Sequence, residues 1–470
     1  MSIKIYNTLT RQKEDFTPIN APEVSFYACG PTVYDYFHIG NARVFMVFDV
    51  IRRYLEYRDY KVTYVQNFTD IDDKVIQKAW DMGRKPEEVA EQFIEAYYAD
   101  AQSLKIKTAK IHPRATEHIN PILELIQKLY SQDIAYESDG DLLFDTSKFS
   151  DYGKLSQQKQ EELMAGARVE VDEKKRNPLD FVLWKAAKPG EPSWESPWGK
   201  GRPGWHIECS AMAMCYLGET VDIHAGGPDL IFPHHENEVA QSEAASGKPF
   251  VKYWMHAGYL NINDEKMSKS LGNVLNIREL LQNYNPLDIR FFMLSSHYRN
   301  PLNFNQELLY SAAAGRQRLQ TMFDNLLAGL ERADSFPHAA AEQKLVDKLE
   351  STRKEFIDAM DDDFNTAEAI GALFSLTREV NAYLQNEKLN RDILENIKDY
   401  LLEVNDILDI IEPPREAELE DRIKEAINRR EEARRSKDFA TADAIRDQLK
   451  EEGIILEDTP QGVRWRFGDN

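Results

Sequence analysis

The chain contains little cysteine and no long apolar run. Only three cysteines occur among 470 residues, at positions 29, 209 and 215, and so few, so widely spaced, do not make a disulfide framework. The first residues lack the apolar core of a signal peptide, and no later run approaches the ~18 apolar residues of a membrane span. We therefore expect a soluble, cytoplasmic protein with no membrane association.

Positive charge is also scarce. Lysine and arginine number 58 against 80 acidic residues, which gives a formal net charge of −22. Such acidity argues against unspecific adhesion to nucleic acid or anionic membranes, although it leaves room for a local basic site. The length suffices for about three domains.

The sequence HIGN at 38–41 stands where a predicted strand leads into a helix. Residues 23–28 are β-branched and aromatic, as in a buried strand, and residues 42–57 carry apolar side chains at helical spacing. A second predicted strand and helix complete a βαβ unit, and such units bind ligands at the carboxyl ends of their parallel strands. Cys29 and Thr69 would then face the same crevice.

The HIGN sequence admits two interpretations. The N–H groups and positive dipole end of a helix N-terminus, with the side chains of His38 and Asn41, can hold an anion such as a phosphate, and Gly40 permits close approach. The alternative is an ordinary helix start with a capping Asn and a solvated His. These four residues alone do not decide between them.

The composition changes between residues 121 and 201. A predicted helix (122–129) and hairpin (134–144) precede a highly charged segment (157–177) and a Pro- and Gly-rich stretch (188–204). We interpret the region as an insertion into the α/β domain that includes a mobile surface loop.

Two cysteines, a histidine and a glutamate suggest a metal site. His234 and Glu238 are four residues apart on one predicted helix face, and mixed sulfur, nitrogen and oxygen ligands favour zinc. No C-x-x-C pair occurs, so the ligands would have to converge through the tertiary fold. The alternative is that the cysteines are inert buried side chains, as Cys215 is expected to be in the packing of a helix. The candidate set is Cys29, Cys209, His234 and Glu238, with His235, Glu236, His206 and His224 as further candidates.

A lysine-containing loop lies further along the chain. Lys266 and Lys269 flank small hydroxyl residues in the sequence KMSKS at 266–270. Lysine is a compact cation suited to phosphate, and such a pair can clamp a triphosphate while charge moves to the departing pyrophosphate. The alternative is a solvated basic turn.

With HIGN early and KMSKS late, the chain resembles the class I aminoacyl-tRNA synthetases. Within that class it is similar to the cysteinyl-tRNA synthetase family, and the likeness extends over essentially the whole chain. The blocks that carry it are CGPTVY (29–34), FTDIDDK (68–74), WHIECS (205–210) and FPHHENE (232–238).

The resemblance implies one zinc ion per chain, to which the thiolate of substrate cysteine binds as a further ligand. Zinc lowers the pKa of a thiol and prefers the soft thiolate, so serine would be a poor substitute. A pocket that relies on shape discriminates isosteres only about a hundredfold. Such a metal–sulfur bond would make a separate editing site unnecessary. The zinc ligands that the resemblance implies are Cys29, Cys209, His234 and Glu238.

The same resemblance assigns the other substrate contacts. Asn41 stands where a second histidine is common in the class, and since an amide carries no charge it would contribute less to phosphate stabilisation. The resemblance implies Thr32, Thr69 and Trp205 in the cysteine pocket, Gly40, Gly227, Asp229 and Lys269 in nucleotide binding, and His38, Asn41, Lys266 and Lys269 in catalysis.

The chain after residue 275 is predicted to be helical, with amphipathic patterns at 308–330, 343–358, 366–384 and 391–411 that indicate a bundle. A locally basic segment follows, which alone would be a solvated helix face. Its residues from 433 onward resemble the anticodon-binding end of the family. Arg and Asp can read guanine edges, and an aromatic ring can stack on an unpaired base. The candidates for reading the GCA anticodon are Arg434, Phe439, Asp443 and Asp458.

We therefore predict an α/β protein with a Rossmann-type parallel-sheet catalytic domain, an inserted subdomain, a helical bundle and a small C-terminal mixed anticodon-binding domain. The predicted division is 1–120 and 202–310 for the halves of the catalytic domain, 121–201 for the inserted subdomain, 311–411 for the bundle and 412–470 for the last domain.

The activity that the resemblance implies is ATP-dependent activation of L-cysteine to cysteinyl-adenylate, followed by transfer to the 3′ end of tRNA(Cys). L-Cysteine, tRNA(Cys) and ATP with Mg²⁺ are the expected partners, and we expect a monomer. One alternative is a ligase that joins cysteine to a small amine, an activity of relatives that lack the C-terminal region. Another is an RNA-binding paralogue without catalysis, against which the intact HIGN, KMSKS and metal-ligand residues argue.

Overall fold

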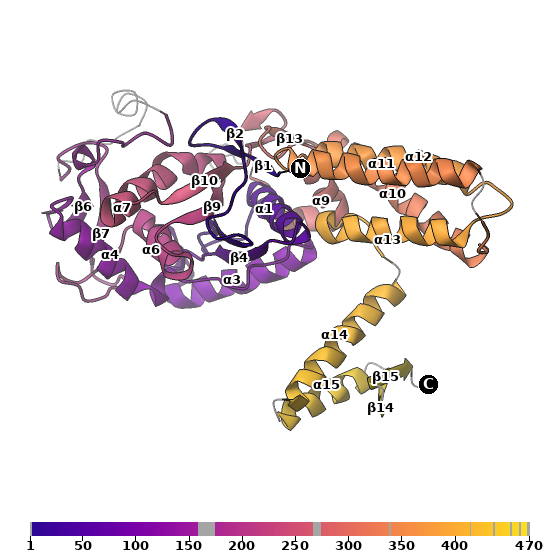
Figure 1. Ribbon diagram of the computed structural model, residues 1–470. Coiled ribbons are helices and arrows are strands. Elements are labelled where there is room, and N and C mark those ends of the chain that lie inside the picture. Colours follow the sequence, from indigo (N-terminus) through magenta and orange to yellow (C-terminus); the bar gives the residue numbers. More distant parts are fainter. Residues whose placement is uncertain are drawn as a thin grey trace. The chain divides into compact units, whose positions relative to one another are not determined.

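The computed structural model describes residues 2–157, 174–266, 274–337, 340–413, 415–435, 438–451, 454–459 and 462–467. The chain divides into two compact units, Met1–Ile410 and Ile411–Asn470 (Figure 1). None of the helices within the described ranges is sufficiently long and apolar to cross a membrane. Most of the predicted charged segment 157–177 lies outside these ranges.

The first unit is built around a parallel sheet. Its strands, in spatial order, are β10 (Val251–His256), β9 (Val221–Gly226), β3 (Glu23–Ala28) and β4 (Lys61–Gln66), and neighbours pair in parallel. Every residue of β9 is buried, as expected of an inner strand in a sheet covered on both faces. The predicted parallel sheet is thus confirmed, and the carboxyl ends of these strands meet at one edge.

Helices cover this sheet. α1 (Ile39–Tyr57) packs against β4, and α6 (Trp205–Leu217) packs against β3, β4 and β9. α1 starts three residues before the predicted helix, because His38 and Asn41 cap its first turn. Other helices of the unit are α2 (Asp73–Met82), α3 (Pro86–Ser103), α4 (Ile119–Ser131), α7 (Glu236–Ser246), α8 (Ile277–Leu281) and α9 (Pro286–Leu294).

An antiparallel sheet lies between β4 and β9 in the sequence. The predicted hairpin at 134–144 is confirmed, and the Pro- and Gly-rich stretch 188–204 ends in a strand that the sequence did not indicate. Glycine permits this pairing, because a Cβ on Gly201 would lie 2.3 Å from Nε1 of Trp184. The strands are β5 (Ala135–Ser138), β6 (Asp141–Phe144), β7 (Phe181–Ala186) and β8 (Gly201–Pro203).

Shorter strands complete the first unit. β1 (Lys4–Asn7) pairs with β2 (Gln12–Asp15) in antiparallel fashion. β11 (Leu260–Ile262) lies between β12 (Glu265–Lys266), its antiparallel neighbour, and β13 (Leu302–Phe304), its parallel neighbour. The β11–β12 hairpin therefore carries the backbone of Lys266.

The predicted helical bundle is confirmed (Figure 1). Its helices start close to the predicted positions because asparagine side chains at 305, 365 and 390 accept N–H groups of the first turns. The helices are α10 (Gln306–Glu331), α11 (Ala340–Asp361), α12 (Thr366–Tyr383) and α13 (Arg391–Leu408).

The second unit combines helices and strands, as predicted. α14 (Arg415–Arg435) and α15 (Phe439–Glu451) pack together, and β14 (Ile454–Thr459) pairs with β15 (Gly462–Phe467) in antiparallel fashion. A small apolar core of Ile423, Leu449 and Ile454 joins the two layers.

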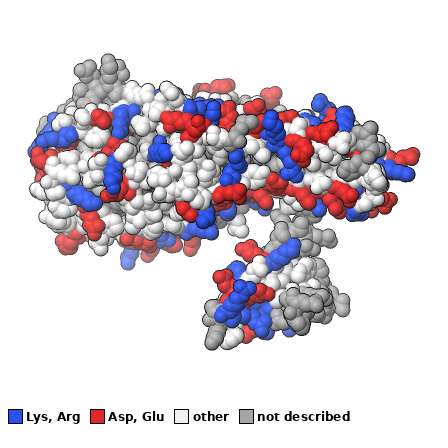
Figure 2. All heavy atoms as spheres, in the orientation of Figure 1, with Lys and Arg blue, Asp and Glu red and all other residues white. Residues whose placement is uncertain are grey.

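Acidic and basic side chains are mixed on the face of the molecule that Figure 2 shows, despite the formal net charge of −22. Exposed ion pairs such as Lys61 with Glu23 are part of this pattern, and each contributes about 0–1 kcal/mol to stability. Removing one partner of a buried ion pair costs more, because it leaves the other charge buried without compensation.

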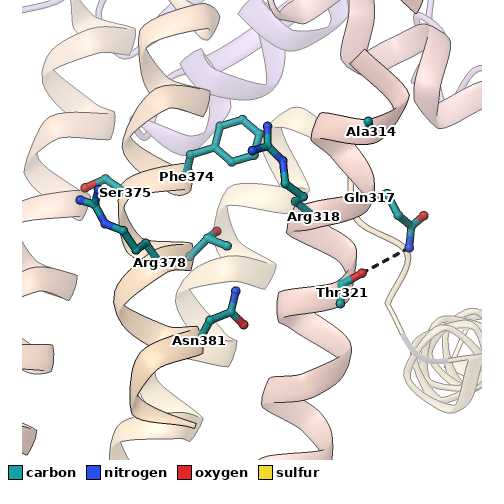
Figure 3. Close-up of a pocket in the computed structure, with 9 residues that line it drawn as sticks. Ala314, Gln317, Arg318, Thr321, Phe374, Ser375, Arg378 and Asn381 are labelled. Carbon is teal, nitrogen blue, oxygen red and sulfur yellow. Dashed lines mark hydrogen bonds between the residues drawn. The ribbon is translucent and has the colours of Figure 1, made fainter. Parts of the chain in front are cut away.

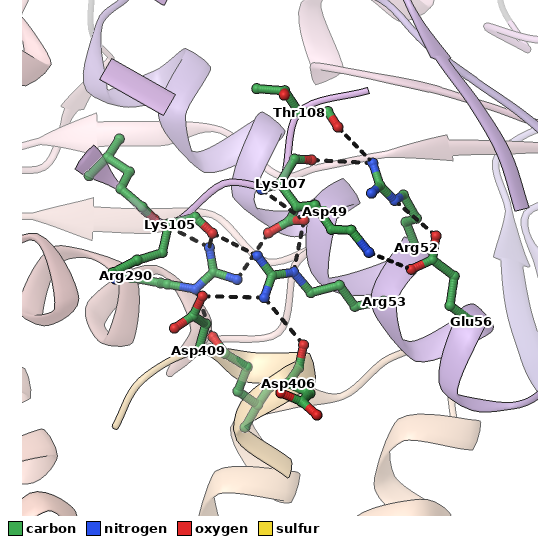
Figure 4. A network of polar contacts seen from close by, with 12 residues as sticks. Asp49, Arg52, Arg53, Glu56, Lys105, Lys107, Thr108, Arg290, Asp406 and Asp409 are labelled. Carbon is green, nitrogen blue, oxygen red and sulfur yellow. Dashed lines mark hydrogen bonds and ion pairs between the residues drawn. The ribbon is translucent and has the colours of Figure 1, made fainter. Parts of the chain in front are cut away.

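A buried ion-pair network joins α1 to the end of the bundle (Figure 4). The carboxylate of Asp49 accepts from Nε of Arg53 at 2.9 Å and from Nη2 of Arg290 at 3.1 Å, and Asp49 and Arg290 are fully enclosed. Nε of Arg290 also donates to the carbonyl of Leu408, and Nη1 of Arg53 lies 3.3 Å from Oδ2 of Asp409. The network therefore fixes the last turn of α13 against α1.

Replacing Asp49 by asparagine should destabilise the first unit. Asp49→Asn keeps the size of the side chain but leaves two guanidinium groups without their shared carboxylate, which costs about 3–5 kcal/mol when an ion pair is buried. Urea unfolding of the full chain, followed by circular dichroism, measures the change. The matched control Glu23→Gln removes an exposed partner and should change stability by less than about 1 kcal/mol; equal effects would contradict the assignment.

Candidate metal centre and active site

Four side chains of the types that bind metal ions converge at the carboxyl edge of the parallel sheet. Cys29 follows β3, Cys209 lies in α6, His234 precedes α7, and Glu238 lies in the first turn of α7. One ligand atom from each lies within 4.8 Å of the others, and all four side chains are buried. The arrangement offers two sulfur atoms, one nitrogen and one oxygen, a donor set that suits zinc.

The His234 ring is held from several sides. Its Nε2 lies 3.0 Å from Oε1 of Glu238, as the four-residue spacing predicts, and its Nδ1 lies 2.9 Å from Nδ1 of His206. The indole of Trp205 stacks on the ring with centroids 4.2 Å apart. Trp205 is 38% exposed, so its ring covers one face of the buried His234 ring at the protein surface.

A second group of ligands overlaps the first. Cys29, His224, His235 and Glu238 also bring one ligand atom each within 4.8 Å of the others. Nε2 of His224 lies 2.9 Å from Oε2 of Glu238, and Nε2 of His235 lies 3.2 Å from Sγ of Cys29. The other nitrogen of His235 is bonded to His256 at 2.8 Å. Two of the further candidates from the sequence thus adjoin the predicted ligands.

Glu236 is turned away from both groups. Its carboxylate accepts the backbone N–H groups of Gly153 at 3.0 Å and Ser156 at 2.7 Å. Glu236 therefore anchors the segment before residue 158, and its candidacy as a metal ligand is not supported by this geometry.

Burial and neighbouring charges shape the electrostatics of the cluster. Burial opposes ionisation of Glu238, but His224 and His234 outweigh it and lower the pKa of that carboxyl to about 2. Burial likewise disfavours charge on His234, yet Glu238 and Cys209 raise its pKa to about 10. A hydrogen bond from Cys29 lowers the pKa of Cys209 to about 6, while burial raises the pKa of Cys29. The cluster thus already favours one thiolate, the ligand form of cysteine.

Cys215 is exposed, so the prediction that it packs within a helix interface is wrong. Cys209 and Cys215 are six residues apart on α6, which rotates them by about 240° around the helix axis. Only Cys209 faces the sheet edge, where it is buried.

The loops after β3 and β4 form a shared wall beside the cluster. Thr32 and Thr69 pair as an isolated parallel bridge, and Thr69 is buried. The loops touch so closely that a Cβ on Gly30 would lie 1.6 Å from the carbonyl oxygen of Asn67. The Asn67 side chain also accepts from the Gly30 N–H at 2.9 Å. Asn67 was not among the predicted site residues, although a polar residue directly after a buried strand is a detectable signal.

The HIGN residues form a capping box at the start of α1. Nδ1 of His38 accepts from the N–H of Asn41 at 3.2 Å, and Oδ1 of Asn41 accepts from the N–H of His38 at 3.3 Å. The capping interpretation is thus correct for these atoms. The ring Nε2 of His38 and the amide Nδ2 of Asn41 are not part of the box, and Gly40 lies between them in the first turn.

The other predicted nucleotide contacts are described only in part. Gly227 follows β9, and a Cβ there would lie 2.7 Å from Oδ1 of Asp229, which is exposed. Lys266 ends β12, with its side chain outside the described part, and Lys269 lies wholly outside the described residues.

The predicted anticodon residues lie in the second unit. Arg434 is in the last turn of α14, and Phe439 starts α15 with its ring 61% exposed. Asp443, one turn after Phe439, pairs with Arg446 at 3.2 Å. Asp458 lies in β14, and its side chain is outside the described part.

A groove of about 890 Å³ lies apart from the cluster of Cys29, Cys209, His234 and Glu238, between α10 and α12 (Figure 3). Gln317 and Arg318 line it from α10, and Phe374 and Arg378 line it from α12, with the Arg318 guanidinium 5.0 Å from the Phe374 ring centroid. None of the site residues predicted from the sequence lines this groove.

Family models match most of the chain. The model described as tRNA synthetases class I (C) catalytic domain matches residues 15–314. A DALR domain model matches residues 355–412, and the Cysteinyl-tRNA ligase anticodon binding domain matches residues 416–466.

Curated relatives match from end to end. The chain is 55% identical over 469 residues to the cysteine–tRNA ligase of Geobacillus thermodenitrificans, covering 99% of both chains. It is 53% identical over 464 residues to that of Clostridioides difficile, covering 99% of this chain and 100% of the relative. Among solved structures, Mycobacterium tuberculosis methionyl-tRNA synthetase in complex with methionyl-adenylate has a TM-score of 0.61 at 15% identity, over 82% of this chain and 92% of that one. This last likeness shows the fold alone.

Two cysteines of α6 give a direct test of the metal centre. Cys209→Ser removes a buried sulfur ligand and should weaken zinc binding by more than about a hundredfold. Loss of a residue that only orients a ligand usually weakens metal binding by up to about a hundredfold, so the loss of a ligand itself should exceed this. Cys215→Ser changes an exposed thiol on the same helix and should leave binding unchanged. Zinc titration of the chelated full chain with a competing chromophoric chelator measures both, and an equal affinity for the two variants would contradict the site.

Proposed function

The chain belongs to the cysteine–tRNA ligase family, and from this membership we infer that it activates L-cysteine with ATP to cysteinyl-adenylate and transfers the cysteinyl group to the 3′ end of tRNA(Cys). The observation that carries the substrate assignment is the buried cluster of two thiols, an imidazole and a carboxylate at the carboxyl edge of the parallel sheet, with the capped start of α1 following β3 in the chain. The cluster supplies selectivity for sulfur, and the helix start supplies an anion site.

We propose that one zinc ion is bound by Cys29, Cys209, His234 and Glu238. Two thiols in this group, against one in the overlapping group, favour it for a soft metal. The bound zinc would bind the substrate as a thiolate, which serine cannot match because its hydroxyl is much harder to deprotonate. His224 would remain bonded to the second carboxylate oxygen and orient it.

The remaining pocket residues have positioning roles in this proposal. Trp205 stacks on the His234 ring of the cluster, and Thr32 and Thr69 join the loops that follow β3 and β4. A cysteine held by its sulfur would then present its carboxylate toward the start of α1. Holding two reactants in this way replaces much of the entropic cost of their encounter.

We propose that the cysteine carboxylate attacks the α-phosphorus of ATP while the bond to pyrophosphate breaks. His38 and Asn41 would donate to the phosphates from Nε2 and Nδ2, the atoms outside the capping box, and Gly40 would allow close approach. Gly227 and Asp229 would bind the ribose. Lys266 and Lys269 would stabilise the departing pyrophosphate, with Mg²⁺ as its counter-ion.

We propose that the second unit reads the anticodon. The exposed ring of Phe439 suits stacking on an unpaired base, and Arg434 and Asp443 lie near it in the sequence. Asp458 is proposed on the resemblance alone. This unit also argues against the alternative of a ligase for a small amine acceptor, since such relatives lack it.

The proposal also covers the cellular location, the oligomeric state and the domain boundaries. Three cysteines without disulfides favour the cytoplasm, and we propose that the protein acts there as a monomer. The five-part division of the chain at residues 120, 201, 310 and 411 also stays a proposal.

Pyrophosphate exchange tests the function and the role of the metal together. With cysteine, the protein should catalyse ATP–pyrophosphate exchange, and serine should be rejected by more than the roughly hundredfold that shape alone provides. Chelation should abolish exchange and added zinc should restore it. Unchanged exchange in protein verified to be free of zinc would refute the metal's role, and exchange absent with every metal would refute the activity.

Aminoacylation tests the anticodon assignment. Phe439→Ala and Arg434→Ala should each lower kcat/KM for tRNA(Cys) by the equivalent of about 1–3 kcal/mol, the cost of losing a base stack or a base-edge contact, with pyrophosphate exchange unchanged. Arg429→Ala, which removes an exposed charge from the same helix as Arg434, is the control. Equal losses in all three variants would indicate a general charge effect.

A further inference from the structure

Arg43 is buried in the second turn of α1 and is bonded to carbonyl oxygens only. Its Nη1 donates to the carbonyls of Gly258 at 3.0 Å and Tyr259 at 2.7 Å. Its Nη2 donates to those of Tyr298 at 3.2 Å and Asn300 at 2.5 Å. The side chain is 0% exposed, and no carboxylate among the described residues pairs with it. One guanidinium thus joins two separate loops to α1.

This arrangement is costly, which indicates a specific role. Burial without a carboxylate lowers the pKa of Arg43 to about 10, and its Nε has no hydrogen-bond partner among the described residues. Arg290, by contrast, is equally enclosed but shares the carboxylate of Asp49. A fixed fork of donors is suited to holding several carbonyls in one geometry.

The two loops lead into the small sheet that carries Lys266. The 258–259 loop enters β11, and the 298–300 loop enters β13, its parallel neighbour. The loops are bonded to each other, since the N–H of Gly258 donates to the carbonyl of Tyr298 at 2.7 Å. They lie so close that a Cβ on Gly258 would be 2.3 Å from the carbonyl oxygen of Asn300.

The described residues that follow the KMSKS sequence in the chain are also hydrogen-bonded to the start of α1. The N–H of Ile39 donates to the carbonyl of Leu275 at 3.0 Å, and His38 pairs with Asn276 as an antiparallel bridge. The entry to β11 and the residues from 275 onward are thus both attached to the first turns of α1. Arg43 makes the hydrogen bonds that attach the entry of β11 to the helix.

We propose that Arg43 is a positioning residue for the ATP half of the reaction. It holds the β11–β12 hairpin, and with it the backbone of Lys266, at a fixed distance from His38 and Asn41. This inference rests on the proposed function, in which those residues bind the ATP phosphates. Arg43 itself touches no substrate, so it acts only through the geometry of this hairpin.

Kinetics of the full-length enzyme provide the first test. Arg43→Met should lower kcat/KM for ATP in pyrophosphate exchange about a hundredfold, the usual penalty for misplacing catalytic groups by about 1 Å. Arg43→Lys keeps the positive charge but not the forked set of N–H donors, so it should lower kcat/KM for ATP by a smaller factor than Arg43→Met. The KM for cysteine and the bound zinc should stay within twofold, since the metal cluster does not contact Arg43. Added guanidinium ion should partly restore Arg43→Met.

The matched control is Arg290→Met, which removes an equally buried guanidinium from outside the site. It should lower stability but leave kcat/KM for ATP within threefold in the folded protein. Equal losses in the two variants, or an equal rise in the KM for cysteine and ATP, would overturn the proposal by showing a general packing defect.

A readout independent of activity separates this inference from the proposed function. Hydrogen–deuterium exchange of the full chain should be faster at 258–266 in Arg43→Met than in the wild type, and unchanged there in Arg290→Met. Gly258→Ala attacks the same junction from the other side and should produce the same kinetic defect, with the double variant no worse than either single one. Unchanged exchange at 258–266, or fully additive defects, would overturn the proposal even if the wild type is fully active, whereas an inactive wild type would refute the function.

Discussion

The structure depends on the burial of Glu238, a carboxylate at the edge of the sheet with no exposed surface. Burying a charge is unfavourable unless partners compensate it, and here His224 and His234 each bond to one of its oxygens. His224 comes from β9 and His234 from the turn before α7. Glu238 therefore fixes the start of α7 relative to β9, close to the thiols of Cys29 and Cys209.

α1 connects this edge to the rest of the first unit. Its first turn is capped by His38 and Asn41, its second turn holds two loops through Arg43, and its middle is fixed to α13 through Asp49. Each of these connections uses a buried polar group with several partners, so a shift of the helix would break many hydrogen bonds together. The helix thus serves as a rigid reference for groups brought from distant parts of the sequence.

Much of this arrangement could be predicted from the sequence. Parallel strands, amphipathic helices and asparagine caps are local patterns, so β3, α12 and α13 start where they were expected. The metal-ligand candidates could be named because two thiols, an imidazole and a carboxylate together are a combination typical of zinc sites. β8 was missed because its pairing with β7 depends on the close packing of Gly201 against Trp184, which no local pattern reports. The exposure of Cys215 follows from which face of α6 meets the sheet, which is likewise a tertiary property.

Arg43 illustrates why tertiary partners decide the role of a residue. In the sequence it is a basic residue two positions after HIGN, with apolar residues three, four and seven positions further on, and this pattern does not report which groups it contacts. In the fold its guanidinium is enclosed and bonded to four carbonyls from two loops, while Arg52 and Arg53 on the same helix serve other segments. Arg43 thus joins α1 to the loops at 258–259 and 298–300, whereas Arg52 and Arg53 both join it to residues 105–108, and Arg53 also joins it to the end of α13. The chemistry at the start of the helix and the packing along its length therefore constrain each other, because any residue that moves α1 moves the HIGN side chains with it.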